Sequence, residues 1–407
     1  MLAGDGFDVC QYRWYNKLVS GATKRAVHVG LNAHLLSLGS DYRSAGITWY
    51  IYNLLAHLPE IDPGIRCTAF LSEKRYEGSP RLKLELSRLP TRRPAVRIVW
   101  EQMLQPLAAR RVGLDLLHGM AFVGPLGSWC PSVVTIHDLS FLFYPQGFRS
   151  LNRLYLKLFA RLSARRARRV IAVSESTKRD AVKQYGVTPG QVDVVHNGVD
   201  PAFHPLATDQ VSAFRADRGL PERFILFVGT LEPRKNIARL VQAYAQLPGA
   251  RPPLIFVGGK GWFYDEIFAL VERLNLEAEV HFVGYVPTDD LPWWYNAADL
   301  FVYPSLYEGF GLPPLEAMAC GTPVVTSTAS SLPEVVGQAG LLVDPTDTEV
   351  LAAAMERGLT DMTLRERMKA MGLARAAGFS WRETARRTID SYRRAVMPPG
   401  EGGAGSV

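Results

Sequence analysis

Two glutamates, Glu308 and Glu316, flank a glycine-rich segment whose residue types could bind a substrate. The apolar run 300–303 before Glu308 predicts a buried strand, and the residues after Gly311 predict a helix that ends near Gly321. Glycine lets a backbone approach a ligand closely, and the unpaired N–H groups at a helix start attract anions. Because carboxylates repel phosphate, we expect the glutamates to hold hydroxyl groups, such as those of a ribose and a sugar. The segment therefore indicates a nucleotide-sugar site.

A second candidate segment, residues 227–236, lies where another apolar strand is followed by a helix. Gly229 permits close backbone approach, and Arg234 and Lys235 place two positive charges at the carboxyl edge of the predicted sheet. A diphosphate leaving group gathers negative charge in the transition state, which cations aimed at it stabilise. Taken alone, an exposed loop with incidental basic residues is an equally good interpretation. The Glu308 segment, expected at the same sheet edge, favours the catalytic one.

The first half of the chain contains two weaker candidates. His137 ends a predicted strand and could bond a sugar hydroxyl or share acid–base work with Asp138, although a lone histidine is often structural. Gly46 lies at a strand-to-helix turn, where a phosphate or an acceptor could approach. The glycine run at residues 258–261 fits no nucleotide fingerprint and predicts a flexible connector. No metal-ligand spacing is present, so we expect no metal and no cofactor besides the nucleotide-sugar.

Composition is that of a soluble globular enzyme: the 407 residues are 47% hydrophobic and 21% charged. No apolar run is long enough to cross a bilayer, and the four cysteines show no paired spacing. Together these features predict a cytoplasmic protein. The net charge is +7, with a dense basic run from Arg161 to Arg169. A solvated helix face is the favoured interpretation of this run, and peripheral contact with the anionic inner face of the plasma membrane is the alternative. Nucleic acid is not an expected partner, because aromatic residues do not interleave with the basic ones.

Short apolar strands alternate with helical segments in both halves, which predicts α/β architecture with two doubly wound parallel sheets facing a central cleft. The predicted strands are residues 27–31, 67–71, 114–118, 132–136, 170–173 and 191–195, and then 224–228, 253–257, 280–283, 300–303, 323–326 and 340–343. A turn-rich segment from Asn197 and the polar stretch to Gly219 predict the linker. We expect a flexible leader (1–23), an N-terminal domain (24–205), a C-terminal domain (206–378), a final helix (379–397) and a disordered tail (398–407).

These motifs resemble those of the retaining glycosyltransferases of family 4 (group 1), which have the GT-B fold. In the second half the resemblance rests on residues 228–236, on 281–287 and 297–305, and on the Glu-x7-Glu spacing of Glu308 and Glu316. In the first half it rests on residues 45–47, 136–138 and 196–200. Together these motifs cover most of residues 25–396, and the paired glutamates are the most specific of them. The resemblance implies that the final helix, with Trp381, returns to the N-terminal domain.

For the donor, the resemblance implies a role for each matched position. Glu308 would contact the hydroxyls of the transferred sugar and Glu316 those of the ribose. The backbone of Phe310, Gly311 and Leu312 would bind the diphosphate, which Lys235 and an arginine would neutralise. Val286 would lie near the base, and Gly229 near the donor.

For the acceptor side, the resemblance implies that His137 lines the donor-sugar or acceptor pocket and that Gly46 lies near the phosphate or acceptor. One position departs from the family pattern: Thr230 stands where many members carry arginine, which makes Arg234 the candidate substitute. The sequence around Arg234 resembles a subgroup with many mannosyltransferases. That likeness favours GDP-mannose as the donor over UDP-linked sugars.

The sequence therefore predicts a retaining hexosyltransferase, with mannose favoured, that acts without a metal. Its acceptor would be a glycan or lipid-linked glycan in the synthesis of cell-surface polysaccharide or lipopolysaccharide. A front-face substitution, in which the leaving phosphate accepts the acceptor's proton, would need no protein nucleophile. The alternative is a non-catalytic nucleotide-sugar-binding component of a glycan assembly complex.

Overall fold

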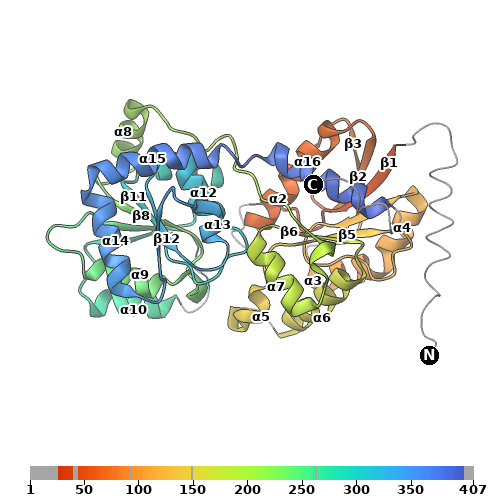
Figure 1. Cartoon of the computed structure of the whole chain (residues 1–407), viewed down its shortest axis with the longest axis horizontal. Helices are drawn as coiled ribbons and strands as arrows, with labels where there is room; N and C mark the ends of the chain where they lie inside the picture. The colour runs from red at the N-terminus through yellow and green to blue at the C-terminus, as the bar shows by residue number, and fades with distance from the viewer. Residues whose placement is uncertain are drawn as a thin grey trace.

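The computed structural model describes residues 26–39, 45–91, 93–147, 150–259, 261 and 264–397. The predicted leader, up to residue 23, and the predicted tail, residues 398–407, lie outside the described residues. Two α/β domains lie side by side, with the first half of the chain in one and most of the second half in the other (Figure 1). No helix of the described part is both long enough and apolar enough to cross a membrane.

Each domain is built on a parallel sheet. The first sheet has the strand order β3-β2-β1-β4-β5-β6-β7, and the second has the order β10-β9-β8-β11-β12-β13. The first sheet comprises β1 (Val27–Asn32), β2 (Ile65–Leu71), β3 (Leu82–Leu86), β4 (Leu116–Gly119), β5 (Ser132–Ile136), β6 (Arg169–Ala172) and β7 (Val192–Val194). The second comprises β8 (Ile225–Val228), β9 (Leu254–Val257), β10 (Val280–Gly284), β11 (Leu300–Tyr303), β12 (Val324–Ser327) and β13 (Leu341–Val343). Both orders reverse direction at an inner strand, as in doubly wound sheets, which bind ligands beyond the carboxyl ends of their strands.

Helices cover both sheets. The first domain contains α2 (Ala45–Ile61), α3 (Pro94–Val99), the π-helical turn η2 (Trp100–Leu104), α4 (Gln105–Val112), α5 (Ser140–Phe143), η3 (Pro145–Gly147), α6 (Ser150–Arg166), α7 (Glu175–Tyr185) and η4 (Pro189–Gln191). The second contains α8 (Thr208–Asp217), η5 (Pro233–Lys235), α9 (Ile237–Ala245), α10 (Asp265–Arg273), η6 (Thr288–Asp290), α11 (Leu291–Ala297), α12 (Leu312–Ala319), α13 (Leu332–Val336), α14 (Thr348–Thr360) and α15 (Met362–Ala376).

The sequence analysis missed one strand and interpreted one helix as part of the linker. The edge strand β3 was not predicted, because only Leu82 of its five residues is buried and the apolar signal is weak. The polar stretch interpreted as part of the linker forms α8, whose Val211 packs into the core of the second domain. An amphipathic helix with a single well-buried apolar residue has little periodicity for a sequence pattern to detect.

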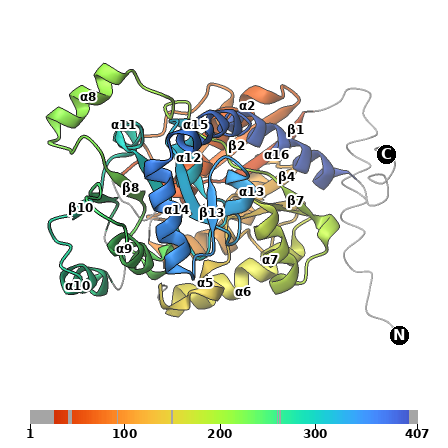
Figure 2. The ribbon, with the colours of Figure 1, turned by 60° about the vertical axis from the view of Figure 1, so that its left-hand side comes forward.

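The last helix, α16 (Trp381–Val396), returns to the first domain and packs beside α2 (Figures 1 and 2). Its buried apolar side chains, Trp381, Ala385, Ile389, Tyr392 and Ala395, recur at helical spacing and join a core cluster with β1, β2 and α2. The hydroxyl of Tyr392 lies 2.7 Å from Nδ1 of His118. The expected crossing of the final helix is thus confirmed, as is the two-domain α/β fold.

The chain crosses between the domains twice, and the two crossings touch. The N–H of Val199 donates to the carbonyl of Phe379 (3.1 Å), and Val199 forms an isolated parallel bridge with Ser380. A Cβ added at Gly198 would lie 2.1 Å from the backbone nitrogen of Trp381. Only glycine therefore fits where the two crossing segments meet.

Candidate active site at the domain junction

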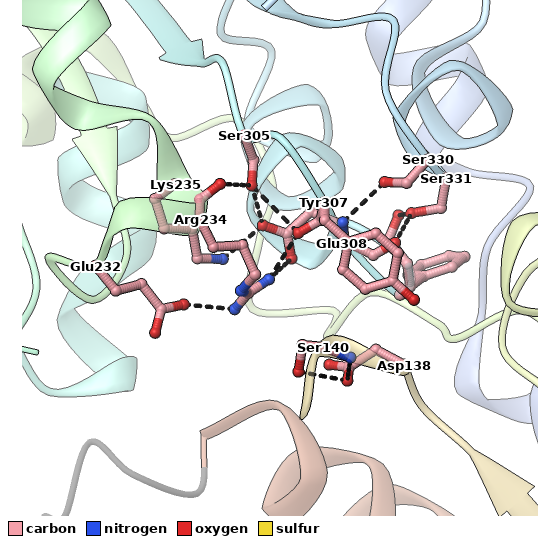
Figure 3. A network of polar contacts seen from close by, with 12 residues as sticks. Asp138, Ser140, Glu232, Arg234, Lys235, Ser305, Tyr307, Glu308, Ser330 and Ser331 are labelled. Atoms are coloured by element: carbon pink, nitrogen blue, oxygen red, sulfur yellow. Dashed lines mark hydrogen bonds and ion pairs between the residues drawn. The ribbon is translucent and has the colours of Figure 1, made fainter. Parts of the chain in front are cut away.

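Glu308 lies at the centre of a buried polar cluster after β11 (Figure 3). Its Oε1 accepts hydrogen bonds from Lys235 Nζ (2.6 Å), Ser305 Oγ (2.6 Å) and the hydroxyl of Tyr303 (3.0 Å). Its Oε2 accepts from Arg234 Nη1 at 3.0 Å. The structure thus brings together three residues that the sequence predicted for one site, Glu308, Arg234 and Lys235.

The two cations keep Glu308 ionised. Burial by itself would raise the pKa of this carboxyl, but the charges of Arg234 and Lys235 and the hydrogen bonds from Lys235 and Ser305 lower it to about 2. A second acid, Glu232, accepts from Arg234 Nη2 at 2.6 Å. Two carboxylates therefore balance two cations in a water-poor site, where charges interact more strongly than in bulk water. A donor diphosphate approaching this cluster would meet cations already held in place.

The loop after Glu308 presents backbone N–H groups. Ser331 Oγ donates to the carbonyl of Phe310 (2.7 Å), and Ser330 Oγ accepts from the N–H of Glu308 (2.8 Å). Among the described residues, the N–H groups of Phe310, Gly311 and Leu312 donate to no protein acceptor. Gly311 caps α12 at φ 108°, a conformation that favours glycine. The predicted diphosphate segment is thus an anchored loop with free donors, the arrangement that binds anions.

Glu316 lies one helical turn further along α12. Its Oε2 accepts a hydrogen bond from the hydroxyl of Tyr295 (2.8 Å), and burial raises its pKa to about 7. The residues around it come from both domains and form a pocket lined by Trp49, Asn53, Gly198, Val199, Asp200, Ala202, Phe203, Thr288, Asp289, Leu312, Glu316 and Trp381. Val286, predicted near the base, is buried in the core of the second domain, two residues before Thr288 of this pocket.

Gly229 directly follows β8 and lies against a neighbouring stretch of backbone. Its φ is 154°, and a Cβ added at Gly258 would lie 2.0 Å from the Gly229 carbonyl oxygen. The N–H of Leu231 also donates to the carbonyl of Gly259 (3.1 Å). Gly258 and Gly259, interpreted from sequence as part of a flexible connector, are therefore packed against the segment that follows β8. Thr230 lies between these contacts, partly exposed.

His137 directly follows β5 in the first domain and is largely buried. Its Nε2 donates to the carbonyl of Met120 (2.9 Å), and burial lowers the pKa of its imidazole, which is therefore neutral near pH 7. Asp138 accepts from the N–H and the hydroxyl of Ser140, and among the described residues no hydrogen bond joins Asp138 to the His137 ring. Gly46 lies in the first turn of α2, where no described atom lies within 4 Å of a Cβ added to it.

Contacts between the domains flank the Glu308 loop. The hydroxyl of Tyr307 donates to Asp180 (2.9 Å) and accepts from the N–H of Leu139 (3.0 Å). The carbonyl of Gly309 accepts from Ser174 Oγ at 2.6 Å. A Cβ added at Gly309 would lie 1.8 Å from the His137 carbonyl oxygen, so the two domains touch directly at the loop that follows Glu308.

Sequence reasoning missed the residues that orient the predicted ones. Tyr303 and Ser305 hold Oε1 of Glu308, Glu232 holds Arg234, and Tyr295 holds Glu316. Nearness along the chain could have indicated two of them, because Glu232 stands two positions before Arg234 and Ser305 stands three positions before Glu308. Tyr295 had no such signal, because it lies 21 positions from Glu316. Within the described part of the chain, no group of three or more His, Cys, Asp or Glu side chains has metal-binding geometry.

Comparison with known proteins identifies the family. A model described as "Glycosyl transferases group 1" matches residues 211–374, in the second domain, and one described as "Glycosyltransferase Family 4" matches residues 44–203, in the first. The O-antigen chain mannosyltransferase B of Escherichia coli is 36% identical over 326 residues, which are 79% of this chain and 85% of that protein. The chain belongs to the group 1 (family 4) glycosyltransferases.

A second relative and a solved structure are also similar to this chain. The serotype-specific mannosyltransferase WbdA of Escherichia coli is 33% identical over 286 residues, 68% of this chain but only 35% of WbdA, so the chain spans about a third of that relative. The sucrose-phosphate synthase of Thermosynechococcus elongatus superposes with a TM-score of 0.73 at 26% identity, covering 90% of this chain and 98% of that one. The protein is thus a glycosyltransferase with the GT-B fold.

Proposed function

We propose that this glycosyltransferase is a retaining mannosyltransferase that transfers mannose from GDP-mannose to a glycan or lipid-linked glycan of a surface polysaccharide. The observation that carries the chemistry is the cluster in which Glu308 lies ionised beside Arg234 and Lys235 and next to free backbone donors. The choice of mannose is supported by the similarity to mannosyltransferases of O-antigen synthesis.

Each group has a proposed task. The free N–H groups of the loop 310–312 and the two cations bind the diphosphate and stabilise the charge that grows on it as the bond to the sugar breaks. Within the described part of the chain Oε2 of Glu308 accepts from one donor, Arg234, and so keeps an acceptor position for a hydroxyl of the sugar. Glu316 accepts from the ribose hydroxyls in the pocket between the domains.

In the proposed front-face reaction, the acceptor hydroxyl attacks the anomeric carbon from the side of the leaving group. The bond from that carbon to the phosphate oxygen breaks, the bond to the acceptor oxygen forms, and the acceptor's proton passes to the leaving phosphate. No protein nucleophile is needed. The neutral ring of His137 serves as a wall and hydrogen-bonding group of the sugar pocket, consistent with its lowered pKa. Independence of a metal is part of the proposal, with Arg234 and Lys235 supplying the positive charge.

The first experiment asks which nucleotide-sugar the protein binds. Thermal shift against GDP-mannose, UDP-glucose, UDP-galactose, UDP-N-acetylglucosamine and ADP-glucose should single out GDP-mannose, because a ligand bound only by the folded state raises Tm. Transfer to a mannoside acceptor, with EDTA present, should then release GDP and give a product whose anomeric configuration, read by NMR, matches the donor's.

Three results would contradict the proposal. An inverted product would rule out retention, loss of transfer in EDTA would rule out metal independence, and a preference for a UDP-linked sugar would rule out the donor. Donor binding without hydrolysis or transfer to any acceptor would favour the alternative, a non-catalytic nucleotide-sugar-binding component.

A further inference from the structure

Helix α6 exposes a row of leucines on the first domain. Leu151 is 84% exposed, Leu154 is 62% exposed and Leu158 is 50% exposed. Their spacing of three and four residues places them on one face of the helix, whereas Tyr155 and Ala160 face the core. Figures 1 and 2 both show α6 along the lower edge of the molecule. Large apolar side chains exposed together mark interaction surfaces.

Basic residues alternate with these leucines. The helix contains five basic residues, Arg153, Lys157, Arg161, Arg165 and Arg166, and no acidic one. Lys157 and Arg161 are exposed beside the leucine row. The rest of the predicted basic run is largely engaged by the protein: Arg165 donates to the carbonyl of Tyr185 and Arg169 pairs with Asp193. The charge available to a partner therefore lies with the leucines and not at the end of the run.

A second apolar row lies on the neighbouring segment. Val99, Met103 and Leu107, four residues apart along α3, η2 and α4, are each more than half exposed. This segment lies against α6, because the hydroxyl of Tyr155 donates to Oε2 of Glu101 at 3.1 Å. Glu101 is the one acid of residues 94–112, and it is buried. Neither helical segment thus presents a carboxylate to solvent.

We propose that this α6 face, defined as Leu151, Leu154 and Leu158 with Lys157 and Arg161, docks on an anionic lipid bilayer. The leucines enter the boundary between headgroups and acyl chains, and the two cations contact acidic headgroups. A protein partner fits less well, because the centres of protein interfaces are depleted in lysine and enriched in aromatic residues. The proposal rests on the proposed function in one respect, because a lipid-linked acceptor would require the transferase to work at a membrane surface.

Vesicle co-sedimentation of the full chain tests the docking without any sugar donor. The wild type should bind vesicles of phosphatidylcholine mixed with phosphatidylglycerol, bind phosphatidylcholine alone weakly, and dissociate as salt rises. The variant L154S/L158S should lose about tenfold or more in affinity, since both side chains lose their apolar contact with the acyl chains. The variant K157Q/R161Q should lose the preference for anionic lipid.

V350S is the matched control, because Val350 is an exposed apolar residue on α14 of the second domain. It should bind vesicles as the wild type does, and all variants should keep the wild-type Tm and the wild-type thermal shift with GDP-mannose. Equal vesicle binding by L154S/L158S would overturn the proposal, as would absence of binding by the wild type. A wild-type dimer that L154S/L158S converts to monomer would assign the face to self-association and overturn it too. A failed donor shift in the wild type would instead count against the proposed function.

Discussion

The two oxygens of the Glu308 carboxylate have different surroundings. Oε1 accepts three hydrogen bonds, from Lys235, Ser305 and Tyr303, which leave it no capacity for a ligand. Oε2 accepts one, from Arg234. The protein thus holds the carboxylate through Oε1 and leaves Oε2 able to accept a further hydrogen bond, which the proposed function assigns to a sugar hydroxyl.

The charge balance of this cluster predicts how Glu308 and Lys235 variants behave. Glu308→Gln should abolish transfer and cost about 3–5 kcal/mol of stability, because it leaves buried cations without their partner. Lys235→Met should also abolish transfer. The double variant should recover much of the lost stability while remaining inactive, as measured by urea unfolding and GDP release. Wild-type-like turnover in either single variant would contradict the assigned roles.

The raised pKa of Glu316 predicts a pH dependence of donor binding. In the proposed site the ribose hydroxyls bind the ionised carboxylate, so donor affinity should weaken as the pH falls through about 7, by up to about tenfold per pH unit. Glu316→Gln should bind more weakly at high pH and lose this dependence. Calorimetric titration with the donor at several pH values measures both. A pH-independent affinity in the wild type would argue against a contact with Glu316.

Stability provides a check that needs no ligand. The folded pKa of Glu316 is raised above its ordinary 4.5, so its stabilising contribution is complete below 4.5 and is lost as the pH rises through about 7. Relative to the wild type, Glu316→Gln should therefore gain stability over that window, by about 1 kcal/mol because the side chain is partly exposed in its pocket. Melting curves across the window, with Glu349→Gln on α14 as control, measure the difference.

At the scale of elements, the loop between β11 and α12 lies on the second domain and contacts the first. It carries Glu308 on the second domain, and its Gly309 carbonyl accepts from Ser174 at the start of α7. The carboxylate of Glu334 on α13 accepts from the N–H of Glu175 (2.9 Å) and from His196 (2.6 Å). A carboxylate at a helix N-terminus is favourable, so α7 is a docking point for the second domain.

The contact at Gly309 predicts that one substitution can disturb the fit between the two domains without unfolding either of them. Gly309→Ala would place a Cβ 1.8 Å from the His137 carbonyl and hold the domains apart. We expect kcat to fall about 100-fold, since small misplacements of reacting groups have effects of that size, with a smaller change in donor affinity. Tm should change little, because each domain has its own core.

Gly190→Ala is the control for this variant, because a Cβ at Gly190 meets no atom within 4 Å. Its kcat should equal that of the wild type. A wild-type kcat for Gly309→Ala would show that the contact between the donor loop and His137 is not needed for transfer.

At the scale of the whole molecule, α16 makes the C-terminal end of the chain part of the first domain. Ile389 and Tyr392 are buried in the cluster that contains β1 and α2. The two domains are consequently joined by a pair of touching segments, at Val199 and Ser380, and not by a single linker. Such a junction suits a hinge, because few residues cross it.

Shortening a buried side chain of α16 should therefore lower the stability of the N-terminal domain, although α16 lies near the C-terminal end of the chain. Ile389→Ala should cost about 2–5 kcal/mol, because it opens a cavity in that core. Val350→Ala, at an exposed position on α14, should change stability by no more than about 0.5 kcal/mol. Urea unfolding followed by fluorescence measures both. Equal stabilities of the two variants would mean that α16 does not contribute to the core of the first domain.

Local patterns in the sequence predicted the paired sheets, the glutamates and the cations, because strand hydrophobicity and turn residues act over a few positions. They missed β3 and α8, whose weak apolar faces acquire partners only from distant residues. The neutral state of His137 likewise depends on burial against Met120, Tyr50 and Phe122. The sequence by itself thus determined the fold class, the family and the grouping of Glu308 with Arg234 and Lys235. Only the tertiary structure decided which oxygen of Glu308 is available and that Gly309 meets His137, because those contacts join side chains and backbone far apart along the chain.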